Sequence, residues 1–135
     1  MIVVDSSALV AVFFDEPEKA AFQAIIDGDD RCVLSAVNAH ETACVLRGRH
    51  GSAAVERFWQ WLADNHVEIA PFDEMQVRAA AVAFDRHGKG LKGSASKAHL
   101  NLADCAAYAL AKTMNAPLLF KGNDFAETDV KPAMV

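Results

Sequence analysis

The sequence predicts an α/β fold, a three-layer α/β/α sandwich built around a central parallel sheet. Short runs rich in β-branched residues alternate along the chain with longer stretches rich in Ala, Leu, Glu and Gln, which are good helix formers. Because these stretches are too long for hairpin turns, they must be crossover helices that join parallel strands. Right-handed crossovers then place helices on both faces of the sheet.

Each expected element follows from its local composition. The first strand, residues 2–4, is a β-branched run, and the second, residues 31–34, is centred on Val33. The third and fourth strands are expected at two further short, mainly apolar runs, residues 67–70 and 117–120. The helices are expected at residues 17–27, 36–49, 53–64, 73–86 and 102–114.

Length and composition favour one globular domain, residues 1–135. The 53% hydrophobic and 23% charged content is that of an ordinary folded protein. Cys32, Cys44 and Cys105 show no C-x-x-C spacing, so we expect small buried thiols rather than disulfides or a zinc knuckle. Because no secretory signal or long apolar run is present, we expect a soluble, cytoplasmic protein with no membrane segment.

The charge distribution is uneven. A net charge of -5 argues against indiscriminate binding to a polyanion. Yet no acidic residue occurs between Arg86 and Ala103, whereas Arg86, Lys89, Lys92 and Lys97 are cationic. We call residues 86–97 the basic segment; its glycines and serines predict a loop.

Four carboxylates occupy positions that converge in such a fold. Asp5 and Asp124 follow the first and last predicted strands, at the carboxyl edge where open parallel sheets bind ligands. Glu41 lies in the helix that begins after Ser35, and Asp104 lies in the first turn of a helix that Asn101 would cap. One rim of the sheet could therefore collect all four.

Taken singly, each carboxylate has an ordinary structural explanation. Asp5 could cap the following helix, Glu41 could be a surface residue, and Asp104 could complement a helix dipole. Asp124 lies in a Gly-Asn-Asp sequence that is typical of turns. These alternatives remain open from the sequence alone.

Taken together, the four acids predict a cation site. Like charges about 4 Å apart repel by roughly 1 to 4 kcal/mol, so a bare cluster must take up protons or cations. Hard oxygen ligands select Mg2+ or Mn2+. Zinc is disfavoured because no His or Cys pair accompanies the acids.

Five motifs in order resemble those of the PIN-domain nucleases, specifically the VapC-type toxins of toxin-antitoxin systems. The resemblance runs over nearly the whole chain. The matching segments are residues 2–9 (IVVDSSAL), 34–36 (LSA) followed by Glu41, 84–90 (FDRHGKG), 101–105 (NLADC) followed by 108–111 (YALA), and 118–125 (LLFKGNDF).

The resemblance implies an endoribonuclease that uses Mg2+ or Mn2+, forms a homodimer and is inhibited by a cognate antitoxin protein. It places Asp5, Glu41, Asp104 and Asp124 at the acidic positions that bind metal and catalyse hydrolysis. It also places Ser7 at a hydroxyl position beside the first aspartate. Asp129 lies near Asp124, and the sequence leaves open which of the two completes the site.

By the same resemblance, the basic segment would hold an RNA substrate by its phosphates through Arg86, Lys89, Lys92 and Lys97. The alternative is an ordinary solvated loop. Two other functions remain to be weighed: a non-catalytic binding module, and phosphoryl transfer through an aspartyl phosphate at Asp5. The latter is disfavoured because Ser7, rather than an aspartate, stands two residues after Asp5.

Overall fold

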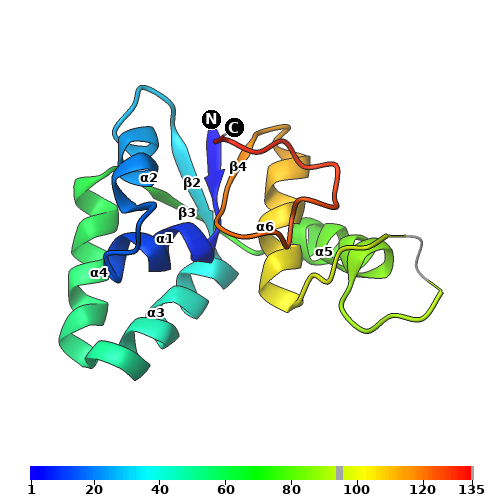
Figure 1. Ribbon diagram of the computed structural model, residues 1–135, viewed down its shortest axis with the longest axis horizontal. Coiled ribbons are helices and arrows are strands. Elements are labelled where there is room, and N and C mark those ends of the chain that lie inside the picture. Colours follow the sequence, from blue (N-terminus) through cyan, green and yellow to red (C-terminus); the bar gives the residue numbers. More distant parts are fainter. Residues whose placement is uncertain (94–95, 135) are drawn as a thin grey trace.

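The structure, a computed structural model, describes residues 1–93 and 96–134. Within them, four parallel strands form one sheet in the order β3-β2-β1-β4 (Figure 1). The strands are β1 (Ile2–Val4), β2 (Cys32–Ser35), β3 (Glu68–Ala70) and β4 (Leu118–Leu119). All four lie where the sequence predicts strands; β4 is shorter than expected because only two of its residues pair with β1.

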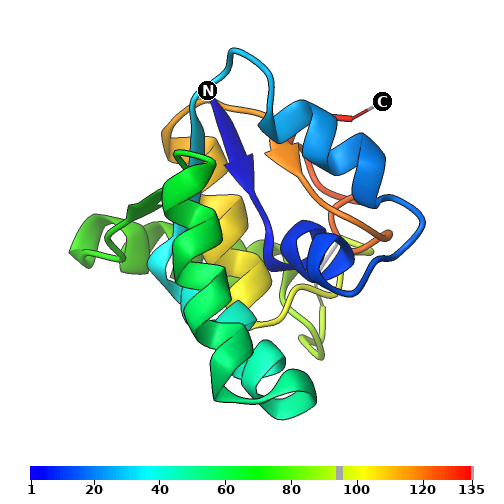
Figure 2. The same cartoon turned by 90° about the vertical axis from the view of Figure 1, so that its left-hand side faces the viewer.

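Helices cover both faces of this sheet, which confirms the predicted three-layer sandwich. One layer holds α1 (Ser6–Phe13), α2 (Lys19–Ile26), α3 (Ala36–His50) and α4 (Ser52–Asp64). The opposite layer holds α5 (Glu74–His87) and α6 (Leu102–Thr113). Figure 1 shows the two layers on either side of the sheet, and Figure 2 shows the four-helix layer turned toward the viewer.

The strand residues divide between two hydrophobic cores. Val4 and Leu34 pack into the core beneath α1 to α4, whereas Val3 and Val33 pack into the core beneath α5 and α6. This alternation is what the pleat of a strand imposes, and it explains why the central residues of β1 and β2 are apolar on both faces. A sheet anchored on both faces holds its carboxyl edge, and the residues that follow it, in a defined place.

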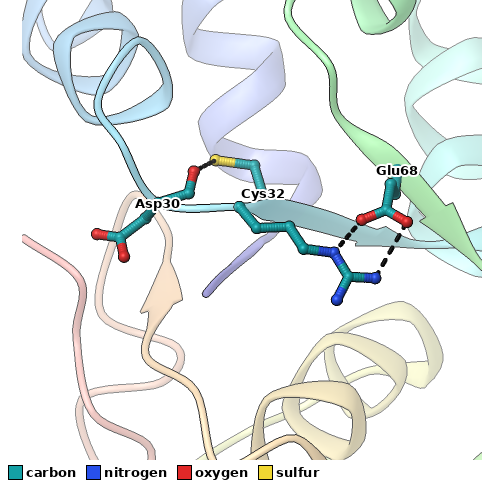
Figure 3. Close-up of polar contacts among 4 residues, drawn as sticks. Asp30, Cys32 and Glu68 are labelled. Carbon is teal, nitrogen blue, oxygen red and sulfur yellow. Dashed lines mark hydrogen bonds and ion pairs between the residues drawn. The ribbon is translucent and has the colours of Figure 1, made fainter.

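The opposite, amino-terminal edge of the sheet carries structural contacts. The Arg31 guanidinium pairs with the Glu68 carboxylate and so joins the starts of β2 and β3, and the Cys32 thiol donates to the Asp30 carbonyl (3.7 Å; Figure 3). No helix within the described residues has the length and apolar character needed to cross a membrane.

The cysteines are free thiols, as the sequence predicts, but they are not all buried. Cys32 and Cys105 lie in the cores, and burial raises the pKa of both thiols. Cys44 is exposed, contrary to expectation, because α3 turns this position outward, where the sulfur lies 3.8 Å from the His40 ring nitrogen Nε2.

Candidate active site

Three helices, α1, α3 and α6, begin at the carboxyl edge of the sheet (Figure 1). Each carries one predicted acid or directly follows one. Asp5 caps α1 directly after β1, and Glu41 lies in the second turn of α3, which follows β2 without a break. Asp104 lies in the first turn of α6, and Asp124 follows β4 in a turn. The elements thus place all four acids toward one end of the sheet.

Asp5 is the buried centre of this group, with 3% of its surface exposed. Its Oδ2 accepts hydrogen bonds from the Ser7 backbone N–H (3.0 Å) and the Ser7 hydroxyl (2.6 Å). Its Oδ1 is buried without a hydrogen-bond partner. Desolvation raises the pKa of Asp5 to about 7; the bonds from Ser7 oppose this rise, and the charges of Asp104 and Glu41 add to it.

Ser7 links this aspartate to the loop after β4. While its hydroxyl donates to Asp5, its Oγ accepts a hydrogen bond from the Lys121 backbone N–H (2.9 Å). The Lys121 ammonium in turn pairs with Glu18 (2.8 Å) and Glu16 (3.3 Å) in the segment before α2. Ser7 therefore fixes the Asp5 carboxylate relative to the segment that leads to Asp124.

Asp104 combines helix capping with membership of the acidic group. Its Oδ2 accepts from the Asn101 backbone N–H (3.0 Å), while the Asn101 side chain accepts from the Asp104 N–H (2.8 Å), which together form a capping box. Desolvation raises the pKa of Asp104 to about 6, and the nearby charges of Asp124 and Glu41 contribute. The capping and site interpretations of Asp5 and Asp104 are thus compatible.

Glu41 and Asp124 lie at the more open side of the group. Glu41 is half-buried and Asp124 is exposed, and both are close enough to Asp104 to raise its pKa. Phe125 is buried against Phe120, with ring centroids 5.2 Å apart, and so anchors the turn that carries Asp124.

Asp129 is engaged elsewhere. It accepts a hydrogen bond from the Tyr108 hydroxyl and pairs with the Lys112 ammonium (2.9 Å), which together lower its pKa to about 2. Among the charges that raise the pKa values of Asp5 and Asp104, Asp124 is present and Asp129 is not. This difference favours Asp124 as the fourth acid.

The donor chemistry of the group fits a hard divalent cation. Asp5 Oδ1 is a buried acceptor with no donor, and carboxylates from three further segments surround the same edge. Within residues 1–93 and 96–134, however, no three His, Cys, Asp or Glu side chains are already close enough together to hold a metal ion. A cation would have to draw the carboxylates closer together than they lie here.

The basic segment joins the end of α5 to the cap of α6. Arg86, Lys89, Lys92 and Lys97 are exposed; residues 94–95 lie outside the described part. Backbone hydrogen bonds from Lys89 N–H to the Leu100 carbonyl and from Leu100 N–H to the His87 carbonyl, both 2.9 Å, close its base. Because Asn101 follows at once, the segment leads into the turn that carries Asp104.

Sequence reasoning missed Asn38, which is fully buried beneath the acids. Its Nδ2 donates to the Ser6 hydroxyl (3.0 Å) and to the Ala103 carbonyl (3.1 Å). The available signal was a polar residue three positions before Glu41, hence on a neighbouring part of the helix surface.

A separate hollow of about 460 Å³ lies at the opposite edge of the sheet. Its lining includes Asp29, Asp30, Asp64 and His66, all of which are exposed. No buried side-chain acceptor without a partner is among its lining residues within the described chain. The carboxyl edge is therefore the better candidate for chemistry.

Comparison with known proteins shows the family of the chain. The PIN domain family model matches residues 2–131, and the chain belongs to that family. Within it, the VapC ribonuclease Mb0640 of Mycobacterium bovis is 38% identical over 129 residues, which are 96% of this chain and 95% of the relative. The resemblance predicted from the sequence is thereby confirmed.

Solved structures share the fold at low sequence identity. The crystal structure of Mycobacterium tuberculosis VapC20, described as a sarcin-ricin loop cleaving toxin, has a TM-score of 0.76 at 16% identity, covering 98% of this chain and 100% of that one. A toxin-antitoxin complex from Klebsiella pneumoniae has a TM-score of 0.70 at 16% identity, covering 96% and 93%. Both likenesses support the PIN-type sandwich.

Proposed function

We propose that this protein is the toxin of a type II toxin-antitoxin system and a metal-dependent endoribonuclease that hydrolyses RNA phosphodiester bonds at the carboxyl edge of its sheet. The observation that carries the proposal is the buried Asp5, whose Oδ1 has no partner and whose pKa is raised in part by Asp104 and Glu41. Such a carboxylate is stabilised by a proton or by a cation. The ribonuclease name of the relative at 38% identity supports the activity.

In this proposal Asp5, Glu41, Asp104 and Asp124 hold Mg2+ or Mn2+. A divalent cation held by these carboxylates would supply a water of lowered pKa and neutralise charge on the scissile phosphate. Ser7 fixes the orientation of Asp5 through its two hydrogen bonds. Glu41 or Asp104 accepts the proton of the attacking water, because each is partly accessible at the edge of the group.

The basic segment is proposed to bind the RNA backbone. Arg86, Lys89, Lys92 and Lys97 are exposed beside the α6 cap, and their charge offsets the repulsion between an acidic protein and a polyanion. Because the segment leads directly to Asp104, phosphates bound there would lie along the approach to the acids.

The proposed partners are an antitoxin protein and a second copy of the chain, in the cytoplasm. The Klebsiella pneumoniae structure of the same fold is titled a toxin-antitoxin complex, which supports an antitoxin partner. Co-purification with the protein encoded by the neighbouring gene and the mass of the purified chain in solution test these two assignments separately.

The activity is tested with RNA cleavage by purified Asp5→Asn and Asp104→Asn variants in Mg2+ or Mn2+. Both substitutions keep the side-chain shape and remove the charge, so cleavage should fall to background while the circular dichroism spectrum is unchanged. Asp129→Asn is the matched control, because Asp129 binds Tyr108 and Lys112 instead, and it should cleave like the unmodified protein. Full activity in Asp5→Asn would refute the catalytic assignment.

A further inference from the structure

Asn38 is a buried amide at the point where three acid-bearing segments meet. It lies on α3, three residues before Glu41, and none of its surface is exposed. A buried amide requires partners to offset desolvation, and Asn38 finds them on two other helices. Its Nδ2 donates to the Ser6 hydroxyl of α1 at 3.0 Å and to the Ala103 carbonyl of α6 at 3.1 Å.

Each of these attachments is adjacent in the chain to one acid. Ser6 follows Asp5, Ala103 precedes Asp104, and Asn38 itself lies one helical turn before Glu41. A single side chain therefore ties together the backbones that carry three of the four carboxylates. Removing it would break this link to α6 and leave α1 and α3 joined here by the bond from the Ser6 hydroxyl to the backbone carbonyl of residue 38.

The orientation of the amide is determined by its surroundings. The Ala103 carbonyl can only accept a hydrogen bond, so the amide nitrogen must face it. The Ser6 hydroxyl, which accepts from Nδ2, in turn donates to the backbone carbonyl of Asn38 (3.3 Å). The Thr42 hydroxyl donates to the same carbonyl (2.8 Å). Asn38 Oδ1 is buried without a partner, so the two bonds of Nδ2 hold the side chain.

We propose that Asn38 is the positioning residue of the site, holding α1, α3 and α6 at the separation that lets Asp5, Glu41 and Asp104 share a cation. This inference rests on the metal site proposed above. It assigns Asn38 no contact with substrate or cation. Residues that orient metal ligands are worth about tenfold to a hundredfold in metal affinity when removed.

The test is calorimetric titration of Mn2+ into metal-free protein, which measures binding without catalysis. Asn38→Ala should raise the dissociation constant for Mn2+ by about tenfold relative to the unmodified chain. Ser6→Ala removes one hydrogen-bond partner of Asn38 and hardly changes the side-chain volume. It should raise the dissociation constant by roughly threefold, as expected for the loss of one neutral hydrogen bond. Asp5→Asn should remove binding.

Gln76→Ala is the matched control. Gln76 is also a buried amide that joins two helices, with Nε2 donating to the Thr113 hydroxyl (2.7 Å) and Oε1 without a partner. Thr113 lies nine residues beyond Asp104 on α6, about 14 Å along the helix axis. The control should lose stability as Asn38→Ala does, yet bind Mn2+ like the unmodified protein.

The outcomes separate this inference from the proposed function. Equal Mn2+ affinity in Asn38→Ala and the unmodified chain, or equal weakening in Asn38→Ala and Gln76→Ala, would overturn the positioning role while leaving the metal site in place. If Asn38→Ala does not fold, unchanged affinity in Ser6→Ala overturns it. An unmodified chain that binds no Mn2+ overturns both proposals.

Discussion

The burial of Asp5 makes the stability of the metal-free protein depend on pH in an unusual direction. The pKa of Asp5 is about 7 in the folded protein, against 3.8 for an unperturbed carboxyl group. A raised folded-state pKa means that folding takes up a proton between these values. The stabilisation is therefore complete at low pH and is lost as pH rises through about 7.

The magnitude follows from the same two values. At pH 5 the folded carboxyl group is about two pH units below its pKa and stays protonated, whereas in the unfolded chain it is mostly ionised. Each pH unit below the pKa corresponds to about 1.4 kcal/mol. Asp5 therefore contributes about 3 kcal/mol to the free energy of unfolding at pH 5, and this contribution is absent at pH 8. Asp104, whose pKa is raised to about 6, acts in the same direction.

Urea denaturation in the presence of a chelator tests this expectation for the unmodified chain and Asp5→Asn. The free energy of unfolding of the unmodified chain, relative to the variant, should fall by about 3 kcal/mol between pH 5 and pH 8. Because the comparison is between two proteins, titration of the histidines cancels. A difference that stays constant with pH would refute the burial argument.

Asp129→Asn provides the control for this titration. Because Tyr108 and Lys112 lower the pKa of Asp129 to about 2, the folded group is ionised throughout the range from pH 5 to pH 8. Its stability difference from the unmodified chain should therefore be independent of pH in that range.

Three further predictions concern the cation, the backbone and the basic segment. Mg2+ or Mn2+ at about 100 times its dissociation constant should raise the free energy of unfolding by about 2.7 kcal/mol at pH 8, seen as a higher melting temperature, and a flat titration would contradict the site. Gly88→Ala should destabilise the fold by about 1 to 3 kcal/mol in urea, since a Cβ there would lie 2.4 Å from the Phe84 carbonyl oxygen; unchanged stability would refute the clash. Replacing Lys89, Lys92 and Lys97 together by Ala should reduce the slope of log affinity for single-stranded RNA against log salt by about 2, and an unchanged slope would exclude phosphate contacts.

The architecture was predictable because its signals are local. The β-branched run before Asp5 favours a strand, the stretch of helix-forming residues after Ser35 favours a helix, and crossover geometry then leaves few topologies. The exposed Cys44 was not predictable, because the many alanines of α3 are compatible with more than one buried face. Composition indicates that a helix forms, but not which side faces the core.

The candidate site was predictable only in outline. The sequence could place Asp5 and Asp104 at one edge, yet it presented capping and ligation as alternatives, whereas one oxygen of Asp5 caps while the other is left without a partner. The choice between Asp124 and Asp129 depends on partners far away in the chain, which no local pattern reveals. Asn38 was missed for the same reason.

Hydrogen bonds from Ser7 and Asn101 offset only part of the cost of burying Asp5 and Asp104 at the sheet edge. Ser7 and Asn101 each bind one oxygen of an acid, and these bonds lower the pKa values of Asp5 and Asp104 against the larger effect of burial. The cost of burying these charged carboxylates, to which their mutual repulsion adds, is therefore not relieved within the described part of the chain, and it favours any cation that can reach the edge. A site organised in this way is destabilising when empty at neutral pH and stabilising when filled, so metal affinity and the pH dependence of folding should change together in every variant that alters Asp5.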